Sequence, residues 1–206
     1  MRVKSEARRQ AIIDVAKEAF CRQGFEATSM SEIASRVGGS KATLYNYFRS
    51  KEEIFIAVME SSATDRIAEA FKILEENTDI RFTLVDFGMH YLKSIISPDI
   101  VAIRRMAINE AERSDIGRHF YENGPKKGWL LLNHYLQKQV GQNVLVPCDV
   151  WVCAMHLKAL LESEVVEQHA LGVIKEIDDT QLKNVVTRAV SVFLKAYQTQ
   201  DKNSAE

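Results

Sequence analysis

Cysteine is scarce in this 206-residue chain, and its spacing argues against a disulfide framework. The three cysteines, Cys21, Cys148 and Cys153, are odd in number and form no Cys-x-x-C pair. Domains held together by disulfides usually carry an even number of cysteines at characteristic spacings. The sequence therefore predicts reduced thiols in a cytoplasmic protein.

Long apolar segments are missing as well. No apolar run approaches the roughly 18 residues that a membrane-spanning helix requires. Residues 1–10 are charged and contain no apolar core of the kind found in a signal peptide. We therefore expect neither secretion nor a membrane partner.

Strand patterns are the third absence, since no stretch alternates apolar and polar residues between turn residues. Helical spacing is found instead along most of the chain. Ile12, Val15, Ala16, Ala19 and Phe20, for example, recur at intervals of three and four and form one helix face. With 46% hydrophobic residues, the chain should fold as an all-α protein with a substantial core.

Proline is rare, and each of the three prolines precedes an apolar-periodic stretch. Because the first turn of a helix does not need the missing N–H, Pro98, Pro125 and Pro147 favour helix starts. We expect helices over ten ranges: 6–23, 29–37, 40–47, 50–76, 80–96, 98–113, 116–122, 125–141, 147–170 and 179–199. Residues 201–206 are expected to form a flexible tail.

Positive charge is concentrated near the N-terminus, although the whole chain carries a net charge of −1. Residues 1–51 hold ten Lys/Arg and five Asp/Glu, a net charge of +5, and the remainder carries −6. A basic module on an acidic body is typical of a protein in which only one end approaches nucleic-acid phosphates. Chance clustering on a solvated face is the alternative explanation.

Three helix-start signals follow one another between residues 29 and 53. Ser29-Met30-Ser31-Glu32 and Ser50-Lys51-Glu52-Glu53 fit capping boxes, and Ser40 can cap the segment between them. Val37-Gly38-Gly39 precedes Ser40 and provides the backbone freedom that a tight turn requires. Two short helices joined by a glycine-containing turn form a helix-turn-helix motif.

The second helix of this motif carries side chains suited to DNA, while Leu44 and Phe48 can point inward. Short polar side chains can reach base edges, and phenol hydroxyls can reach phosphates. The free N–H groups of the helices that start at Ser29 and Ser40 can also face phosphates. The candidate contacts are Lys41, Thr43, Tyr45 and Tyr47, with Lys51 as a further cation. A small surface pair of capped helices with exposed tyrosines is the structural alternative.

The stretch from Ala11 to Ile54 resembles the DNA-binding domain of TetR-family repressors. The resemblance rests on Gly24-Phe25-Glu26-Ala27-Thr28-Ser29, Ile33-Ala34, Gly38, Ser40 to Phe48, and Ser50-Lys51-Glu52-Glu53. It implies that bases are faced by Lys41, Ala42 and Thr43. It implies that the phosphate backbone is held by Thr28, Tyr45, Tyr47 and Lys51. Gly39 departs from the family, which usually has an apolar residue at this position, and the departure puts a small core contact of the recognition helix in doubt.

The rest of the chain has a weaker similarity to the AefR-like group of C-terminal domains. The similarity is carried by Tyr91-Leu92, Glu110-Ala111-Glu112 and Phe120-Tyr121-Glu122-Asn123-Gly124-Pro125. It implies an effector-binding and dimerisation domain but identifies no ligand.

The expected architecture is a three-helix helix-turn-helix DNA-binding domain over residues 1–50, followed by a helical effector-binding and dimerisation bundle over 51–200. Wide apolar faces make helices 147–170 and 179–199 the expected dimer seam. Seven residues on neighbouring helices are candidates for an effector pocket: Phe87, Tyr91, Met106, Trp129, His134, Met155 and His156. Ordinary core packing is the alternative for each of them.

Together with the resemblance to TetR-family repressors, these patterns predict a ligand-responsive repressor that binds a palindromic double-stranded DNA operator as a homodimer and is released by a small, largely apolar effector. No cofactor or metal is expected, because no His-Glu-x-x-His and no Glu-x-x-His spacing occurs. An enzyme is disfavoured, since Gly-x-Ser-x-Gly and a phosphate-binding glycine loop after a strand are also missing. A helical interaction protein that has lost DNA binding is the remaining alternative, with Gly39 as its main support.

Overall fold

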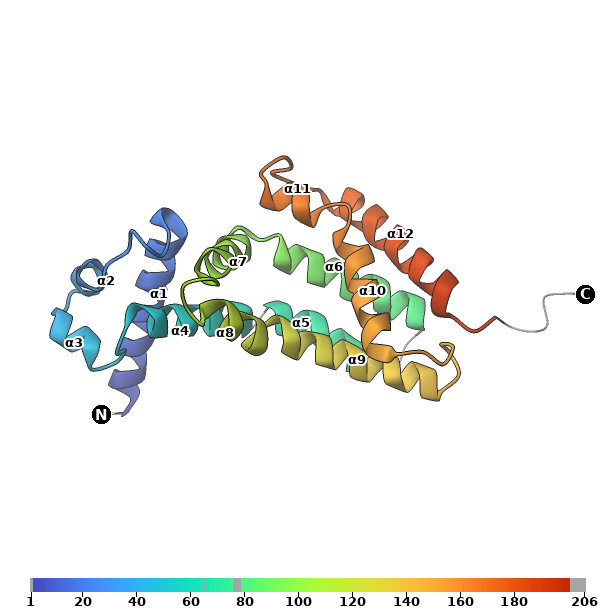
Figure 1. Ribbon diagram of the computed structural model, residues 1–206, viewed down its shortest axis with the longest axis horizontal. Helices are drawn as coiled ribbons and strands as arrows, with labels where there is room; N and C mark the ends of the chain where they lie inside the picture. The colour runs from blue at the N-terminus through green and yellow to red at the C-terminus, as the bar shows by residue number, and fades with distance from the viewer. Residues whose placement is uncertain (1, 65, 76–78, 201–206) are drawn as a thin grey trace, which may run out of the picture. The chain divides into compact units, whose positions relative to one another are not determined.

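The computed structural model describes residues 2–64, 66–75 and 79–200, and within these ranges it is helical with no strand (Figure 1). Leu145 and Gln198 form an isolated antiparallel bridge. Within the described ranges, no helix is both long and apolar enough to cross a membrane. The all-α fold predicted from the sequence is confirmed.

The helices form two compact units, and neither unit is a single continuous stretch of chain. The first unit contains α1 (Arg2–Gln23), α2 (Met30–Val37), α3 (Lys41–Tyr45), α4 (Lys51–Thr64), α7 (Pro98–Glu110) and α8 (Ile116–Asn123). The second contains α5 (Arg66–Lys72), the 3-10 turn η1 (Ile73–Glu75), α6 (Ile80–Ile95), α10 (Val150–Glu162), α11 (Val166–Ala170), α12 (Asp179–Tyr197) and, from residue 126 onward, α9 (Pro125–Gly141).

Two of the three prolines begin helices as predicted, Pro98 in α7 and Pro125 in α9. Pro147 lies three residues before α10, whose N-cap Asp149 accepts a hydrogen bond from the Val152 N–H at 3.1 Å. The prediction of a single helix over 147–170 is therefore wrong.

Residues 147–170 instead form two helices, because α10 ends at Glu162 and α11 begins at Val166. The Ser163 hydroxyl donates to the Leu160 carbonyl at 2.9 Å, a local bond that competes with the helical ladder. The helix expected over 50–76 is likewise divided into α4, α5 and η1, and residues 65 and 76 of it lie outside the described part of the chain. The tail expected over 201–206 also lies outside it.

The core of the first unit is built around three phenylalanine rings. Phe55 is fully buried and makes edge contacts with Phe20 and Phe25, with ring centroids 5.4 and 5.3 Å apart. α7 and α8 add apolar side chains to this same core: Ile103, Met106, Ala107 and Ile116. Lys17 on α1 and Asp99 on α7 also form an ion pair at 2.7 Å. Residues 98–125 therefore pack with the helix-turn-helix, and the functional boundary expected at residue 50 stays a prediction.

The second unit is organised around α6, which packs against α5 and α12, while α10 packs against α12 (Figure 1). Gly88 on α6 permits a close approach between these helices. A Cβ atom at this position would lie 2.7 Å from Val186 Cγ1 and 2.9 Å from Leu161 Cδ2. The missing side chain therefore lets α6 lie directly against its neighbours.

The three cysteines carry free thiols. Cys153 is fully buried on α10, and this burial raises the pKa of its thiol to about 12. The negative charge that a Cys148 thiolate would carry is the next cause of the raised pKa. Cys153 therefore stays protonated at neutral pH and behaves as a small apolar side chain.

Candidate nucleic-acid interface

The turn between α2 and α3 is held by backbone hydrogen bonds that end one helix and start the next. Gly38 has the left-handed φ of +72°, and its N–H donates to the Ser35 carbonyl at 3.0 Å. The Gly39 N–H donates to the Ala34 carbonyl at 2.9 Å, which completes a Schellman motif. Ser40 then caps α3 by accepting the Thr43 N–H at 3.0 Å. The helix-turn-helix motif predicted from the sequence is confirmed.

The two predicted capping boxes form only in part. Ser29 accepts the Glu32 N–H at 3.1 Å, but the Glu32 carboxylate accepts a bond from Gln23 Nε2 at 2.7 Å instead of returning to Ser29. Ser50 likewise accepts the Glu53 N–H at 3.2 Å, whereas the Glu53 carboxylate accepts the Arg49 N–H. Both serines therefore cap their helices, and both glutamates contact neighbouring groups.

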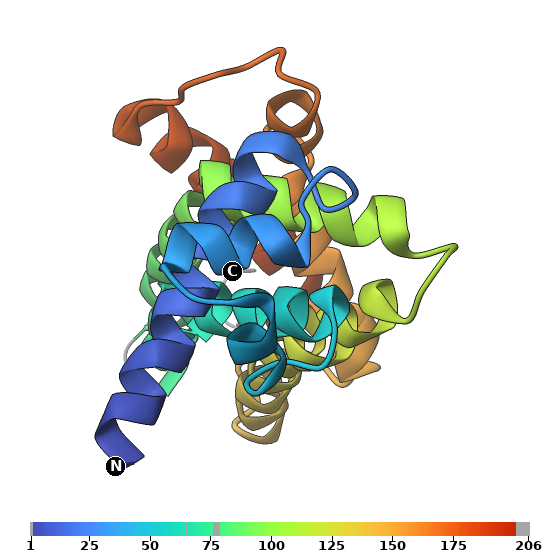
Figure 2. The ribbon, with the colours of Figure 1, turned by 90° about the vertical axis from the view of Figure 1, so that its left-hand side faces the viewer.

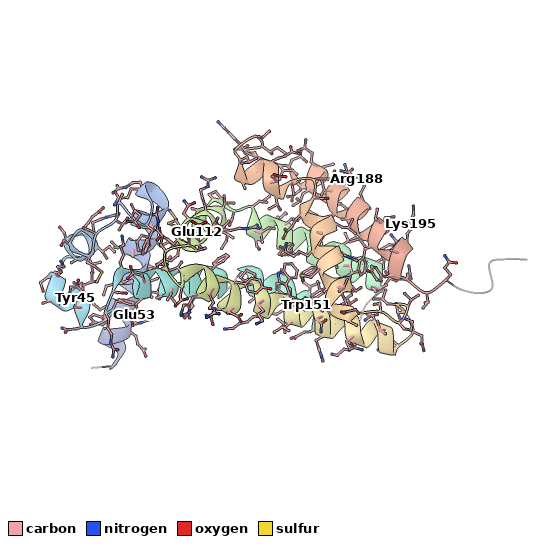
Figure 3. The ribbon with its side chains drawn as sticks, viewed as in Figure 1. Tyr45, Glu53, Glu112, Trp151, Arg188 and Lys195 are labelled. Carbon is pink, nitrogen blue, oxygen red and sulfur yellow. The ribbon has the colours of Figure 1, made fainter. Side chains whose placement is uncertain are left out.

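The recognition helix α3 presents a polar outer face above an apolar anchor. Leu44 and Phe48 are buried in the core, as the sequence predicted. Lys41, Ala42 and Tyr45 are exposed, and Tyr45 lies on the outer side of this short helix (Figure 3). The Lys41 ammonium lies 5.9 Å from the centre of the Tyr45 ring. This face holds a cation, a phenol and a small side chain within two turns.

Thr43 and Tyr47 are half-buried at the edges of this face. The Thr43 hydroxyl lies 2.8 Å from that of Ser40, so the two share a hydrogen bond beside the helix start. Tyr47 packs against the core of the first unit and follows the last turn of α3, where its N–H donates to the Leu44 carbonyl at 3.0 Å. Ser29, at the start of α2, is exposed.

Two residues assigned to phosphate by the resemblance use their polar atoms inside the protein. Thr28 is 1% exposed, and its hydroxyl donates to the Gly24 carbonyl at 2.8 Å. The Lys51 ammonium donates to the Phe25 carbonyl at 2.7 Å and lies 4.2 Å from the centre of the Phe25 ring. Both side chains therefore fix the connection between α1 and α2, and their contact with phosphate stays a prediction.

Two arginines of α1 were not singled out from the sequence, although both contact the motif. The Arg9 guanidinium lies 5.0 Å from the centre of the Phe48 ring. Arg8 Nη2 donates to the Gly38 carbonyl at 3.1 Å, across 30 residues of sequence. Figure 2 looks onto α1, α2 and α3 of this unit. The basic residues at the start of the chain indicate a positively charged surface, but their spacing does not predict which of them contacts the turn.

The seven candidate effector-pocket residues are only partly gathered by the fold. Phe87, Tyr91 and Trp129 form a buried aromatic group in the second unit together with Phe71, with neighbouring ring centroids 5.0–5.8 Å apart. Met106 instead lies in the core of the first unit.

The other three candidates lie near the surface of the second unit. Met155 is half-buried against its core, and His134 is exposed. His156 is also exposed, and its Nδ1 lies 2.5 Å from the Tyr197 hydroxyl. Of the seven, three thus share one aromatic group.

The aromatic group ends in a polar network that the sequence did not reveal. The Tyr91 phenol donates to Glu162, which also accepts a bond from the Lys158 ammonium at 2.7 Å. The Lys158 ammonium lies 5.9 Å from the centre of the Trp129 ring. Gly128 makes room for Phe71, because a Cβ atom there would lie 2.5 Å from Phe71 Cε2.

These elements define a helix-turn-helix DNA-binding protein with a helical bundle. Residues 12–58 match the family of bacterial regulatory proteins of the tetR family, and residues 83–199 match the AefR-like transcriptional repressor C-terminal domain. The chain belongs to the TetR family of transcriptional regulators, with an AefR-like C-terminal domain.

Relatives by sequence are transcriptional regulators and not enzymes. The transcriptional activator FasR of Mycolicibacterium smegmatis is 35% identical over 80 residues, 39% of this chain and 36% of that protein. The transcriptional repressor ComR of Escherichia coli is 27% identical over 161 residues, 75% of this chain and 76% of that protein. The chain thus spans about a third of the first of these relatives. In the described part of the chain, no group of three or more His, Cys, Asp or Glu residues could hold a metal ion.

Two solved structures are similar over almost the whole chain. A TetR-family regulator from Mesorhizobium loti has a TM-score of 0.86 at 26% identity and covers 95% of this chain and 98% of its own. The Flavonoid-responsive Regulator FrrA has a TM-score of 0.75 at 30% identity and covers 95% of this chain and 100% of its own. Both likenesses agree with the family assignment.

Proposed function

We propose that this chain is a ligand-responsive repressor that binds a near-palindromic DNA operator as a homodimer. The observation that carries the proposal is α3, a short helix anchored by Leu44 and Phe48 that presents Lys41, Ala42 and Tyr45 outward. Such a helix fits a major groove, where short side chains read base edges and phenols and backbone N–H groups hold phosphates. ComR is named a repressor and FasR an activator. A reporter assay therefore measures whether this chain lowers or raises transcription from its operator.

The small size of the recognition helix α3 supports a twofold dimer. One helix of five residues makes few base contacts, whereas two such helices about 34–36 Å apart read successive major grooves. α10 and α12 are the proposed seam, because each carries an exposed valine, Val152 (43%) and Val192 (52%). Burying these two side chains against the same helices of a second copy would stabilise such a dimer.

The proposed effector site is the aromatic group of Phe71, Phe87, Tyr91 and Trp129. Its rings favour a small aromatic effector, and the pair of Glu162 and Lys158 offers an acceptor and a donor for a hydroxyl or carbonyl. FrrA, which is named for its response to flavonoids, supports a molecule of this class. Because the rings are buried, the effector binds by favouring a conformer in which they separate, and it releases DNA if that conformer binds the operator less well.

The operator is tested by selecting genomic fragments with the purified protein. We expect enrichment of one near-palindromic site, with enrichment lost in the Lys41→Ala/Tyr45→Ala double variant. Lys175→Ala, which removes an exposed lysine outside the helix-turn-helix, is the charge-matched control and should select the same site. Absence of enrichment by the unmutated protein at low salt contradicts DNA binding, and a single half-site without symmetry contradicts the dimer.

The effector is tested through the fluorescence of Trp129. Trp151→Phe leaves Trp129 as the single tryptophan, because the chain has two. We expect flavone to quench this emission and to lower operator affinity at least tenfold, with Tyr91→Phe weakening the response. Dodecanoic acid, a flexible aliphatic molecule, serves as the comparison. Quenching by dodecanoate alone would assign the site to aliphatic ligands, and binding of flavone without any change in operator affinity would separate the site from regulation.

A further inference from the structure

The turn that precedes the recognition helix lacks a contact that normally accompanies its type. In a Schellman motif the second residue after the helix usually packs an apolar side chain on the last turn. Gly39 occupies that position and has no side chain. The turn therefore depends on backbone hydrogen bonds and on whatever group fills the space beside Gly39.

The group beside Gly39 is the guanidinium of Arg8. Arg8 Nη2 lies 3.0 Å from the place that a Cβ atom on Gly39 would occupy, closer than the Thr43 Cβ at 3.8 Å. The same nitrogen donates to the Gly38 carbonyl at 3.1 Å. A single arginine from α1 thus fills the vacant position and binds the residue that holds the left-handed turn.

We propose that Arg8 is a positioning residue for the recognition helix and that Gly39 is required to admit it. The proposal rests on the proposed operator binding and adds a residue that links α1 to the turn. A hydrogen bond with a charged donor is stronger than a neutral one, so it fixes the turn although it lies near the surface. An apolar residue at position 39 would displace the guanidinium instead of restoring a lost contact.

The alternative role for Arg8 is to bind a DNA phosphate. The Arg8→Lys variant separates the two roles, because lysine can replace arginine in a phosphate contact but not in the turn contact. A phosphate contact depends on charge, which Arg8→Lys keeps. The turn contact depends on the reach and planar geometry of the guanidinium, which lysine lacks. Loss of a phosphate contact also lowers the slope of log affinity against log salt by about 0.9 per contact, or roughly two per dimer.

The test compares Arg8→Ala, Arg8→Lys, Gly39→Val and the Arg8→Ala/Gly39→Val double variant. Operator affinity is measured over a range of salt concentrations with the selected near-palindrome. We expect Arg8→Ala, Arg8→Lys and Gly39→Val each to weaken binding about tenfold with an unchanged salt slope. The double variant should bind no more weakly than Gly39→Val alone, because the two changes remove one contact. Wild-type affinity in Arg8→Lys, or simply additive losses in the double variant, overturns the proposal.

Hydrogen exchange of the free protein separates this proposal from operator binding itself. The amide of residue 39, which donates to the Ala34 carbonyl, should lose about tenfold of its protection in Arg8→Ala and in Gly39→Val, with protection taken relative to the intrinsic exchange rate of the residue present. The Ile33 amide, bonded to the Ser29 carbonyl at the other end of α2, is the internal reference and should be unchanged. If the unmutated chain selects no operator, the exchange of Gly39 still decides whether Arg8 fixes the turn. Unchanged exchange of Gly39 in Arg8→Ala contradicts the positioning role.

Discussion

Raising the salt concentration from 50 to 200 mM is expected to weaken operator binding by about 10³–10⁵-fold, if the dimer contacts roughly six to ten phosphates. The physical reason is that lysine and arginine side chains displace counterions from DNA, and the release of these counterions becomes less favourable as the salt concentration rises. Residues 1–51 carry a net charge of +5, and Lys41 is exposed on the recognition helix. The measurement is a series of titrations of the selected operator at five or more salt concentrations.

Two further measurements show whether the salt dependence arises from phosphate contacts. Far-ultraviolet circular dichroism at each salt concentration should be constant, so that the loss of affinity reports on binding and not on unfolding. The Lys41→Gln variant shows whether the Lys41 ammonium contacts a phosphate or a base. A fall in slope of about two per dimer indicates a phosphate contact, whereas an unchanged slope with relaxed sequence preference indicates a base contact. A flat salt profile for the unmutated protein is the result expected of a protein-interaction module, and it would contradict DNA binding.

The helices and the motif were predictable because their signals are local. Proline at positions 98 and 125, serine caps at 29 and 40, and the glycine at 38 each act on the backbone within one or two turns. The break after Glu162 was missed, since the Ser163 hydroxyl can compete for a carbonyl without interrupting the apolar period. Local chemistry therefore predicts a helix boundary where a proline, a serine cap or a left-handed glycine marks it, and misses a boundary that only a side-chain hydroxyl marks.

The grouping of helices was not predictable, because it depends on which apolar faces meet. Met106 belongs to an apolar-periodic helix that could face either core from its sequence alone. The structure places it with Phe55 in the first unit, whereas Phe87 and Trp129 meet in the second. Residue type marks the pocket candidates as aromatic, sulfur-containing or imidazole side chains, but it does not encode which distant helix packs against each of them. The same limit hid the contact between Arg8 and Gly38.

Replacing Phe55 with alanine is expected to lower the free energy of unfolding of the first unit by about 3–5 kcal/mol. The ring is fully buried and packs edge-on against both Phe20 and Phe25, so its removal leaves a cavity that rigid aromatic neighbours cannot fill. A loss of this size is a large part of the roughly 5–15 kcal/mol that stabilises a typical domain. Urea unfolding measures the loss, and it should be accompanied by failure to bind the operator near the physiological temperature.

Hydrogen exchange of the same variant tests whether residues 98–125 belong to the DNA-binding unit. Because α7 and α8 share the core of Phe55, their amides should lose protection together with those of α1 and α4. Phe87→Ala is the matched control, since Phe87 is equally buried in the second unit and stacks on Tyr91 with ring centroids 5.7 Å apart. That variant should lower protection in α6, α10 and α12 first. If α7 and α8 follow Phe87→Ala and not Phe55→Ala, they unfold with the second unit, and the boundary expected at residue 50 is the better description of the domains.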